Sequence, residues 1–356
     1  MRLKKLSFFL LFLFVLCSLK GQKYSNEFLS IGVGARAQAL GNAVVGSTAD
    51  VTAAYWNPAG LVFISEEVGL QLGAMHSEWF AGIGKYDFIG MTVPFADNKS
   101  RIGISIVRFG IDNIPNTLSL YEDDGTINYD NITAFSAADY AFLGSYARKL
   151  NANWAVGGNL KIVRRNIGTF ASSWGFGLDF SLQYRKDKWR IGLLGRDITT
   201  TYNSWVTNFT ERERQVLAIT GNDIPINSTE ITRPSILFGV GYAFEFGAFS
   251  VIPELDLVAT TDGKRNVLLA AEPFSVDPAA GIELLYNQKI AFRAGVNQFQ
   301  RQSDFERSDY WTVRPSLGVG LQLSNLVIDY AFTDVGDSQN TFSHIISLML
   351  NLKKKK

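Results

Sequence analysis

The residues best suited to chemistry in this sequence are its two histidines, His76 and His344. His344 adjoins Ser343 and lies near Ser347, and a serine, a histidine and a carboxylate in contact would form a lipase-type hydrolase site. The glycine-flanked motif that exposes a nucleophilic serine on a sharp turn is missing around both serines. The pattern therefore favours a structural histidine, and we predict that the chain is not an enzyme. Hydrolysis is the weakest of three functional hypotheses.

Two further motifs could bind small ligands. The acidic turn Glu122–Gly125 offers oxygen ligands for calcium, but it lacks the spacing of an EF-hand loop. Residues Gly32–Ala37 match the dinucleotide pattern G-x-G-x-x-A, but no buried strand precedes them. Cys17 is the only cysteine and lies in a predicted signal peptide, so a disulfide or thiolate metal site is excluded. We expect no cofactor and no metal.

The first 21 residues have the pattern of a secretory signal peptide. A basic start is followed by the apolar run Leu6–Leu16, which is shorter than the roughly 20 residues of a spanning helix. The chain carries 34 basic and 33 acidic residues, and removal of the four basic residues in the signal leaves 30 against 33. This balance gives no reason to expect a nucleic-acid partner.

From Val68 onward the dominant hydrophobic period is two. In Trp174–Tyr184 every even position is large and apolar, and every odd position is small or polar. Alternation over ten or more residues exceeds an ordinary strand and fits a tilted strand that crosses a bilayer. The second face combines many glycines with charged residues, which suits a polar barrel lumen with the apolar face toward lipid. Those charged residues are Arg190, Glu254, Asp256, Glu283, Arg293 and Asp329.

Fourteen segments carry this alternation, and the linkers between them are alternately short and long, as in bacterial barrels with periplasmic turns and outer loops. The sequence therefore predicts an all-β, transmembrane antiparallel barrel of about 14 strands over residues 68–352, followed by a basic periplasmic tail, 353–356. The segments are 68–75, 86–95, 101–110, 139–149, 153–164, 174–184, 188–196, 234–246, 248–258, 278–287, 289–297, 311–323, 325–332 and 343–352.

Residues 22–67 precede the first strand and lack the two-residue period. They are rich in Gly, Ala, Ser and Thr, and we expect them to fold into the lumen as a plug. Asp50 can cap a short helix that runs to Trp56, because the following Asn57–Pro58 disfavours helical geometry. The motif Asn57, Pro58, Ala59 and Gly60 is predicted to shape this plug, which is a structural role.

The same region resembles a known family. The sequences GARAQALG at Gly34–Gly41 and YWNPAGL at Tyr55–Leu61 resemble the N-terminal signature of the PorV/PorQ family. That family belongs to a broader group of barrels similar to the fatty acid transporter FadL, whose plug also carries an Asn-Pro-Ala stretch. The chain departs from a common barrel ending, because Asn351–Leu352 is followed by four lysines in place of a terminal aromatic residue.

The resemblance implies a Gram-negative outer membrane of Bacteroidota type and a role in the type IX secretion system. Members similar to PorV hold the C-terminal domains of secreted cargo and pass them from the translocon to the attachment machinery, and those similar to PorQ anchor a surface component of it. Apolar residues in the predicted loops Ile111–Ala138 and Asp197–Arg233 would contact such a partner. The candidate contacts are Ile114, Leu118, Leu120, Tyr121, Ile127 and Tyr129.

An alternative hypothesis is a FadL-like passive transporter of hydrophobic small molecules. It predicts an apolar pocket under the outer loops and a kink or gap in the wall. Gly103 and Gly110 in the third strand are candidate positions for that gap. Outer-membrane lipid surrounds the barrel under either hypothesis, and a hydrophobic ligand is expected only under the second.

Overall fold

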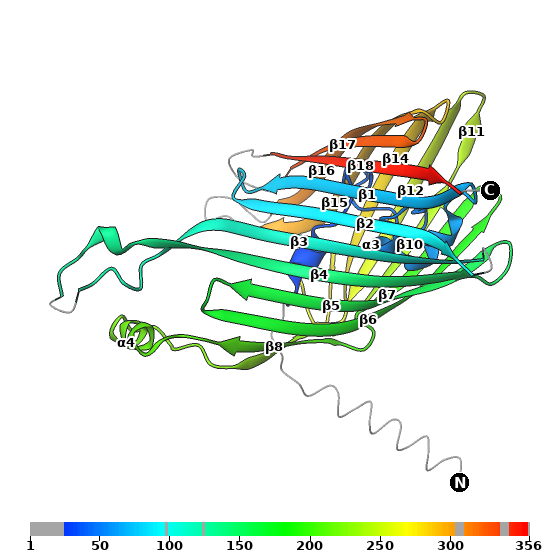
Figure 1. Cartoon of the computed structure of the whole chain (residues 1–356). Helices are drawn as coiled ribbons and strands as arrows, with labels where there is room; N and C mark the ends of the chain where they lie inside the picture. Colours follow the sequence, from blue (N-terminus) through cyan, green and yellow to red (C-terminus); the bar gives the residue numbers. More distant parts are fainter. Residues whose placement is uncertain (1–24, 97–98, 123–124, 303–309, 335–341, 355–356) are drawn as a thin grey trace, which may run out of the picture.

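The computed structural model of the chain describes residues 25–96, 99–122, 125–302, 310–334 and 342–354. The predicted signal peptide lies outside these residues, as do Asp123 and Asp124 of the acidic turn and Lys355 and Lys356 of the tail. In the described part, the strands form one antiparallel sheet that closes on itself around the N-terminal segment (Figure 1). None of the helices in this part is long and apolar enough to cross a membrane.

Fourteen strands form the wall, and the pairing of β18 with β1 closes it. Each of the fourteen alternating segments in the sequence coincides with one of these strands, so the barrel and its strand number are confirmed. The wall strands are β1 Val68–Trp79, β2 Gly84–Phe95, β3 Ser100–Asn116, β4 Thr133–Lys149, β5 Trp154–Ile167, β6 Ala171–Lys186, β7 Trp189–Arg196, β10 Ser235–Tyr242, β12 Phe249–Thr260, β14 Ser275–Tyr286, β15 Ile290–Gln302, β16 Tyr310–Leu323, β17 Leu326–Asp334 and β18 Phe342–Lys353.

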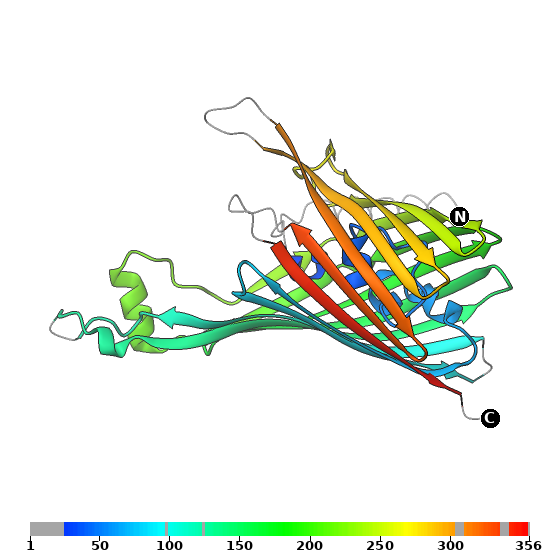
Figure 2. The same cartoon turned by 90° about the horizontal axis from the view of Figure 1, so that it is seen from above.

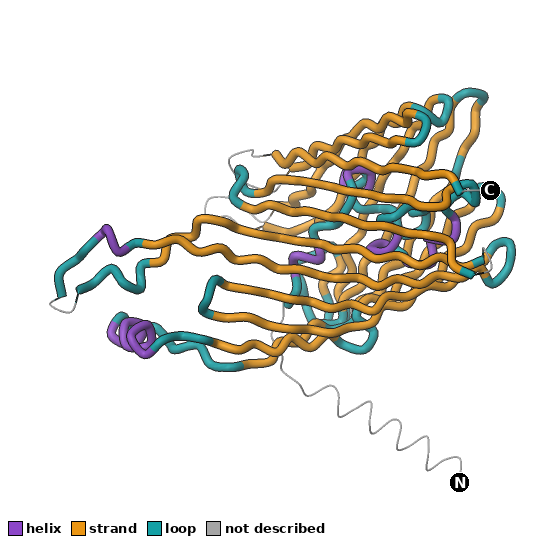
Figure 3. The backbone as a smooth tube through the Cα atoms, viewed as in Figure 1, coloured by secondary structure: helices purple, strands orange, loops and turns teal. Residues whose placement is uncertain are grey.

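Four shorter strands extend this wall. β11 (Phe244–Phe246) continues β10 beside β12, and β13 (Leu269–Ala270) pairs with β14. β8 (Thr201–Thr207) continues β7 beside β6, and β9 (Ser228–Thr232) pairs with β8. The outer ends also carry the short helices η4 (Tyr129–Asn131) and α4 (Glu211–Ile219), and the β3–β4 hairpin reaches well beyond the barrel (Figures 1 and 3).

The predicted loop boundaries were wrong at these outer ends. β3 continues to Asn116 and β4 begins at Thr133, both inside the range predicted as a loop, and Ile114 pairs with Phe135. The register shifts between Ile111 and Ile114, which moves the side chains to the opposite face and interrupts the two-residue period. The two-residue period therefore ends at the bulge, although β3 continues beyond it to Asn116.

The outward face of the wall is apolar, as expected for a surface in contact with lipid. Large apolar side chains such as Ile89 and Ile104 are exposed on it. Where the short turns join the strands, aromatic rings lie in pairs, as in the aromatic girdles of membrane barrels. The rings of Trp154 and Tyr184 have centroids 4.8 Å apart, and neighbouring pairs follow at similar spacing. Figure 2 shows strands on opposite sides of the barrel running at an angle to one another, as strand tilt requires.

The N-terminal segment fills the lumen as predicted. It contains η2 (Glu27–Ser30), α2 (Ala35–Ala39), α3 (Ala53–Trp56) and η3 (Pro58–Phe63), which Figure 3 shows inside the ring of strands. The predicted cap at Asp50 was wrong. Asp50 Oδ1 accepts a hydrogen bond from the Thr52 backbone N–H (2.8 Å), and α3 begins only after this turn.

Plug and wall are packed backbone against backbone. A Cβ atom added to Gly192 would lie 2.0 Å from the Val45 carbonyl oxygen, and one added to Gly295 would lie 2.1 Å from Leu40. Glycine is therefore the only residue that fits at these two wall positions. This explains why the inward face combines charges with so many glycines.

Candidate functional site

The motif Asn57–Gly60 lies where the plug contacts β5 and β6. Asn57 is fully buried, and its Nδ2 donates to the carbonyl oxygens of Val45 (2.9 Å) and Leu182 (3.1 Å). The Ala59 N–H donates to Ser181 Oγ (2.9 Å). These bonds join one turn of the plug to another and to the wall. The structural role predicted for the motif is compatible with these contacts.

A buried ionic network anchors α2 to the opposite wall. Arg36 donates to both carboxylate oxygens of Glu283 (3.0 and 2.9 Å), and Arg293 joins Glu283 (2.7 Å) to Asp329 (2.7 Å). Burial alone would lower the pKa of Arg36, but its hydrogen bonds and charge interaction with Glu283, together with the charges of Asp50 and Glu254, hold that pKa above its ordinary value. The inward charges predicted on β14, β15 and β17 thus pair with one another and with the plug.

Two further wall carboxylates hold the plug by its backbone. Asp256 Oδ2 accepts hydrogen bonds from the N–H groups of Val44 (2.8 Å) and Val45 (2.9 Å). Glu254 Oε1 accepts from Gly46 (2.7 Å) and from the next residue. Consecutive N–H groups aimed at one side form an anion-binding nest, which fixes this part of the plug against β12.

The hydrogen-bond ladder of the wall is interrupted between β7 and β8. Asp197–Thr200 separate the two strands, and both Asp197 (φ 54°) and Thr200 (φ 61°) have left-handed backbone conformations. Inside the wall, Lys161 Nζ lies 3.1 Å from Asp179 Oδ1 and 2.5 Å from Asp197 Oδ1. A buried ion pair therefore holds the interruption in place.

This position differs from the gap predicted at Gly103 and Gly110. Both glycines lie in β3 and are paired to β2 and β4, so the predicted gap in the third strand is wrong. Gly110 accommodates the guanidinium of Arg108, which lies 2.5 Å from where a Cβ atom would be. A Cβ atom added to Gly103 would lie 3.3 Å from the Met91 carbonyl oxygen, which is a tight contact with the neighbouring strand. The two glycines provide side-chain space without breaking the ladder.

An apolar groove of about 510 Å³ lies on the inner side of the extended wall at its outer end. It is formed by the ends of β3 and β4, the β5–β6 turn, β8 and the start of β9. Phe170 is at its centre, with ring centroids 5.1 Å from Phe135 and 5.6 Å from Phe209. Trp205 and Glu230 also line the groove, and Arg165 stacks over the Trp205 ring. The groove thus combines aromatic walls with few polar groups.

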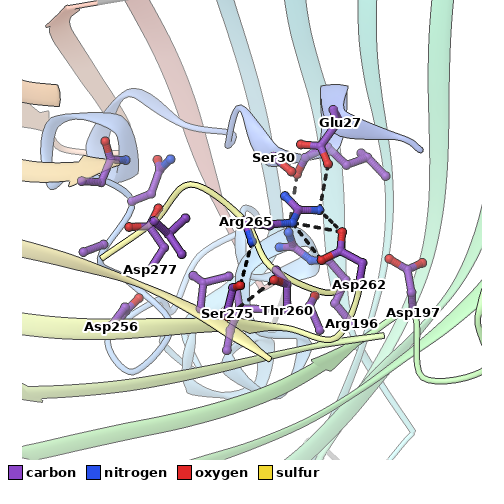
Figure 4. A pocket seen from close by; sticks show the side chains of 18 of the residues that line it. Glu27, Ser30, Arg196, Asp197, Asp256, Thr260, Asp262, Arg265, Ser275 and Asp277 are labelled. Atoms are coloured by element: carbon purple, nitrogen blue, oxygen red, sulfur yellow. Dashed lines mark hydrogen bonds and ion pairs between the residues drawn. The ribbon is translucent and has the colours of Figure 1, made fainter. Parts of the chain in front are cut away.

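A second, polar cavity of about 270 Å³ lies between the plug and β10, β12 and β14 (Figure 4). Arg265, from the loop after β12, reaches over it and pairs with Asp262 (2.5 Å) and with Glu27 of the plug (3.1 Å). Ser25 lines this cavity and donates a hydrogen bond to Glu230 Oε2 (3.1 Å), which lines the groove. Groove and cavity are therefore neighbours separated by this contact.

The sequence matches no family model and no curated protein. Solved structures match along nearly the whole chain. The toluene transporter TodX of Pseudomonas putida is 12% identical with a TM-score of 0.54, and the match covers 90% of this chain and 98% of that chain. A FadL homologue of Pseudomonas aeruginosa is 13% identical with a TM-score of 0.54, over 89% and 97% of the two chains. The chain has the FadL-type barrel fold. At such identities the likeness establishes the fold alone, and the resemblance to PorV and PorQ stays a prediction.

Within this FadL-type barrel the predicted contact residues separate into two groups. Leu118 lines the apolar groove. Tyr121, Ile127 and Tyr129 lie at the tip of the β3–β4 hairpin and are 47, 50 and 71% exposed. Ile114 and Leu120 are half-buried. All six predicted contact residues therefore lie on the β3–β4 hairpin, but they are spread from the groove to the exposed tip and do not form one site.

The histidines of the barrel are not arranged for hydrolysis. His344 Nδ1 lies 2.7 Å from Tyr330 Oη on the outward face, whereas Ser343 is buried on the inward face and donates to the Glu78 carbonyl. Ser347 Oγ accepts from the Ala35 N–H of the plug. His76 Nδ1 pairs with Asp87 Oδ1 (2.7 Å), also on the outer surface. The serine and histidine side chains therefore face opposite sides of β18.

The aromatic residues of the groove were missed by the sequence analysis. Phe170 comes from the linker after the fifth predicted strand, and Trp205 and Phe209 both come from Asp197–Arg233; none was singled out among the candidate residues. Phe135 was grouped with a predicted loop. The only available signal was the presence of several aromatic residues in linkers expected to be polar. That signal does not indicate that these residues contact one another.

Proposed function

We propose that this barrel binds a hydrophobic small molecule in its outer apolar groove and passes it across the outer membrane. The groove itself carries the proposal. A concave site lined by aromatic and aliphatic side chains with a few polar groups at one end is the usual form of a small-molecule site. The transporter hypothesis required such a pocket beneath the outer loops.

Two further observations support a transport role over simple binding. The ladder interruption at Asp197–Thr200 immediately precedes β8, which carries Trp205 of the groove. The proteins TodX and TbuX, whose solved structures share this fold, are described as toluene transporters. A bound aromatic molecule in the groove would therefore lie near the interruption of the ladder at Asp197–Thr200.

Replacing Phe170 with arginine is expected to weaken binding of an aromatic hydrocarbon at least tenfold. The substitution introduces a charge into an apolar site, where its desolvation is unfavourable. The binding of 4-fluorotoluene to the full chain in lipid nanodiscs can be measured by fluorine NMR, with empty nanodiscs correcting for partition into lipid.

Tyr129→Arg provides the matched control, because it replaces an exposed aromatic ring at the hairpin tip outside the groove. It is expected to leave the affinity unchanged. Equal affinities for wild type and Phe170→Arg, in a protein that still shows the gel shift of a folded barrel, would refute the groove as the binding site.

A second candidate function is the docking of a secretion partner, as the resemblance to PorV and PorQ implies. The observation that favours it is an exposed apolar surface at the outer tips. Tyr121, Ile127 and Tyr129 lie on one hairpin, and Arg212 of α4 donates to the Tyr121 carbonyl oxygen (3.4 Å). The two predicted loops therefore meet in one accessible surface.

Substituting Tyr121, Ile127 and Tyr129 together with serine tests this second function. We expect recovery of a translocon, cargo or attachment component from native membranes to fall at least fivefold if the surface docks a partner, because exposed aromatic residues dominate such contacts. Co-purification in mild detergent followed by mass spectrometry measures the recovery. Hydrocarbon binding serves as the control and is expected to stay intact. Unchanged partner recovery and secretion would exclude this surface.

A further inference from the structure

The polar cavity between the plug and strands β10, β12 and β14 is lined by several acceptor oxygens that lack a donor among the described residues. Five of its side-chain oxygens are buried and have no hydrogen-bond partner within the described part of the chain. Asp256 is 1% exposed and Asn297 is 9% exposed, so solvent outside the cavity does not satisfy them. Unpaired buried acceptors are uncommon in folded proteins and point to a bound water or ligand. The five are the Oδ1 atoms of Asn26, Asn42, Asp256, Asp277 and Asn297.

The cationic groups around the cavity have other partners. Arg265 bonds to Asp262 and Glu27, and Arg233 donates to the Thr261 carbonyl oxygen (3.5 Å). Arg196 stacks on the Tyr55 ring at 4.8 Å and approaches plug carbonyl oxygens. No ion pair among the described residues engages Asp256 or Asp277. Asp256 lies beside the Glu254 carboxyl, whereas Asp277 is a carboxyl group of the lining that has no counter-charge in the described part of the chain, in a site where an unpaired charge is unfavourable.

We propose that this cavity binds a small solute that carries a primary ammonium group and further hydrogen-bond donors, such as an amino alcohol or an amino sugar. The ammonium pairs with Asp277, and the hydroxyl groups donate to the neighbouring amide oxygens. A volume of about 270 Å³ has room for about nine water molecules, which corresponds to a solute of monosaccharide size.

An organic cation fits this lining better than a metal ion does. The described residues contain no group of three or more histidine, cysteine or acidic side chains arranged for a metal. Three of the five unpaired oxygens belong to amides, which are neutral acceptors suited to hydroxyl and ammonium donors. Arg265 lies over the cavity and is held there by bonds to Asp262 of its own loop and to Glu27 of the plug (Figure 4).

The inference is independent of hydrocarbon binding in the groove. Asp277 lines the cavity and is absent from the groove, so the two sites can be tested separately. Asp277→Asn keeps the shape of the side chain and one acceptor oxygen while it removes the charge. Asp256 is unsuitable for this test, because its other oxygen holds the plug backbone.

The test compares matched probes on the full chain in detergent micelles by saturation-transfer NMR. Glucosamine and ethanolamine carry the ammonium group, whereas glucose and ethylene glycol carry a hydroxyl group in its place. We expect both amines to bind at least tenfold more tightly than their hydroxyl partners, and Asp277→Asn to remove that difference. Asp130→Asn, on the exposed outer loop, is expected to change nothing. The affinity for 4-fluorotoluene is expected to be the same in all three proteins.

Three results would overturn the proposal. Equal binding of amines and hydroxyl partners, unaffected by Asp277→Asn, would mean a neutral polyol site. Binding of neither would mean that water alone satisfies the acceptors. If Asp277→Asn does not fold, Ala279→Leu fills the cavity from the next inward position of β14 and must abolish amine binding. Amine binding that survives this filling would place the site elsewhere.

Discussion

Replacing Lys161 with methionine is expected to lower the free energy of unfolding by about 3–5 kcal/mol. The side chains of Lys161, Asp179 and Asp197 are 2, 5 and 6% exposed, and the ammonium group lies within ion-pair distance of both carboxylates. The Asp197 N–H also donates to Asp179 Oδ1 (2.9 Å). Loss of the ammonium group leaves two buried carboxylates close together without a counter-charge. This destabilises the folded state much more than loss of one partner of a solvated ion pair does.

Urea unfolding in lipid vesicles, followed by the gel shift between folded and unfolded barrel, measures this loss. Lys149→Met is the matched control, because Lys149 pairs with Glu66 at 3.1 Å and the Glu66 side chain is 78% exposed. Such a pair contributes about 0–1 kcal/mol. Similar unfolding midpoints for the two variants would contradict the anchoring role of Lys161. A Lys161→Met, Asp197→Asn double variant should recover part of the loss, since it removes one of the unpaired charges and asparagine tolerates the left-handed backbone at this position.

The wall of this barrel could be predicted because each strand obeys one local rule. In Trp174–Tyr184 lipid on one side and lumen on the other demand opposite side chains at successive positions, and this signal does not depend on which strands are neighbours. The rule fails where the backbone departs from regular pairing. The bulge at Asp112–Asn113 hid the last part of β3, and the turn at Asp197–Thr200 made β8 look like part of a loop.

The sites could be predicted only in part, because they depend on contacts between distant segments. The inward position of Glu283 and Asp329 followed from alternation, whereas their link to Arg36 did not, since the plug has no period that fixes its orientation. The groove depends on β8 pairing with β6, which brings Trp205 to the level of Ser173. Phe170 and Phe209 meet as a consequence of that register, and composition alone does not specify it.

Replacing Glu283 with alanine is expected to loosen the plug and to expose it to reagents. Arg36 of the plug and Arg293 of the wall both bond to this carboxylate, and Asp329 is left to balance two guanidinium groups. Removal of one partner from a buried ionic network destabilises the folded state by roughly 3 kcal/mol or more. At 1.4 kcal/mol for each factor of ten, opening of the plug should become about a hundredfold more frequent.

A single cysteine at buried Ala43, in a chain that also carries Cys17→Ser, reports this opening through its rate of reaction with a maleimide. Glu245→Ala on the exposed surface of β11 is the control and should leave the rate unchanged. If Glu283→Ala also leaves it unchanged, the network contributes no more to plug retention than a surface charge does. The plug would then be held by the carboxylate contacts of Asp256 and Glu254 with its backbone and by packing against wall glycines such as Gly192. A rate that rises about a hundredfold would instead make the Glu283 network the principal restraint on the plug, because the other contacts are unaltered in that variant.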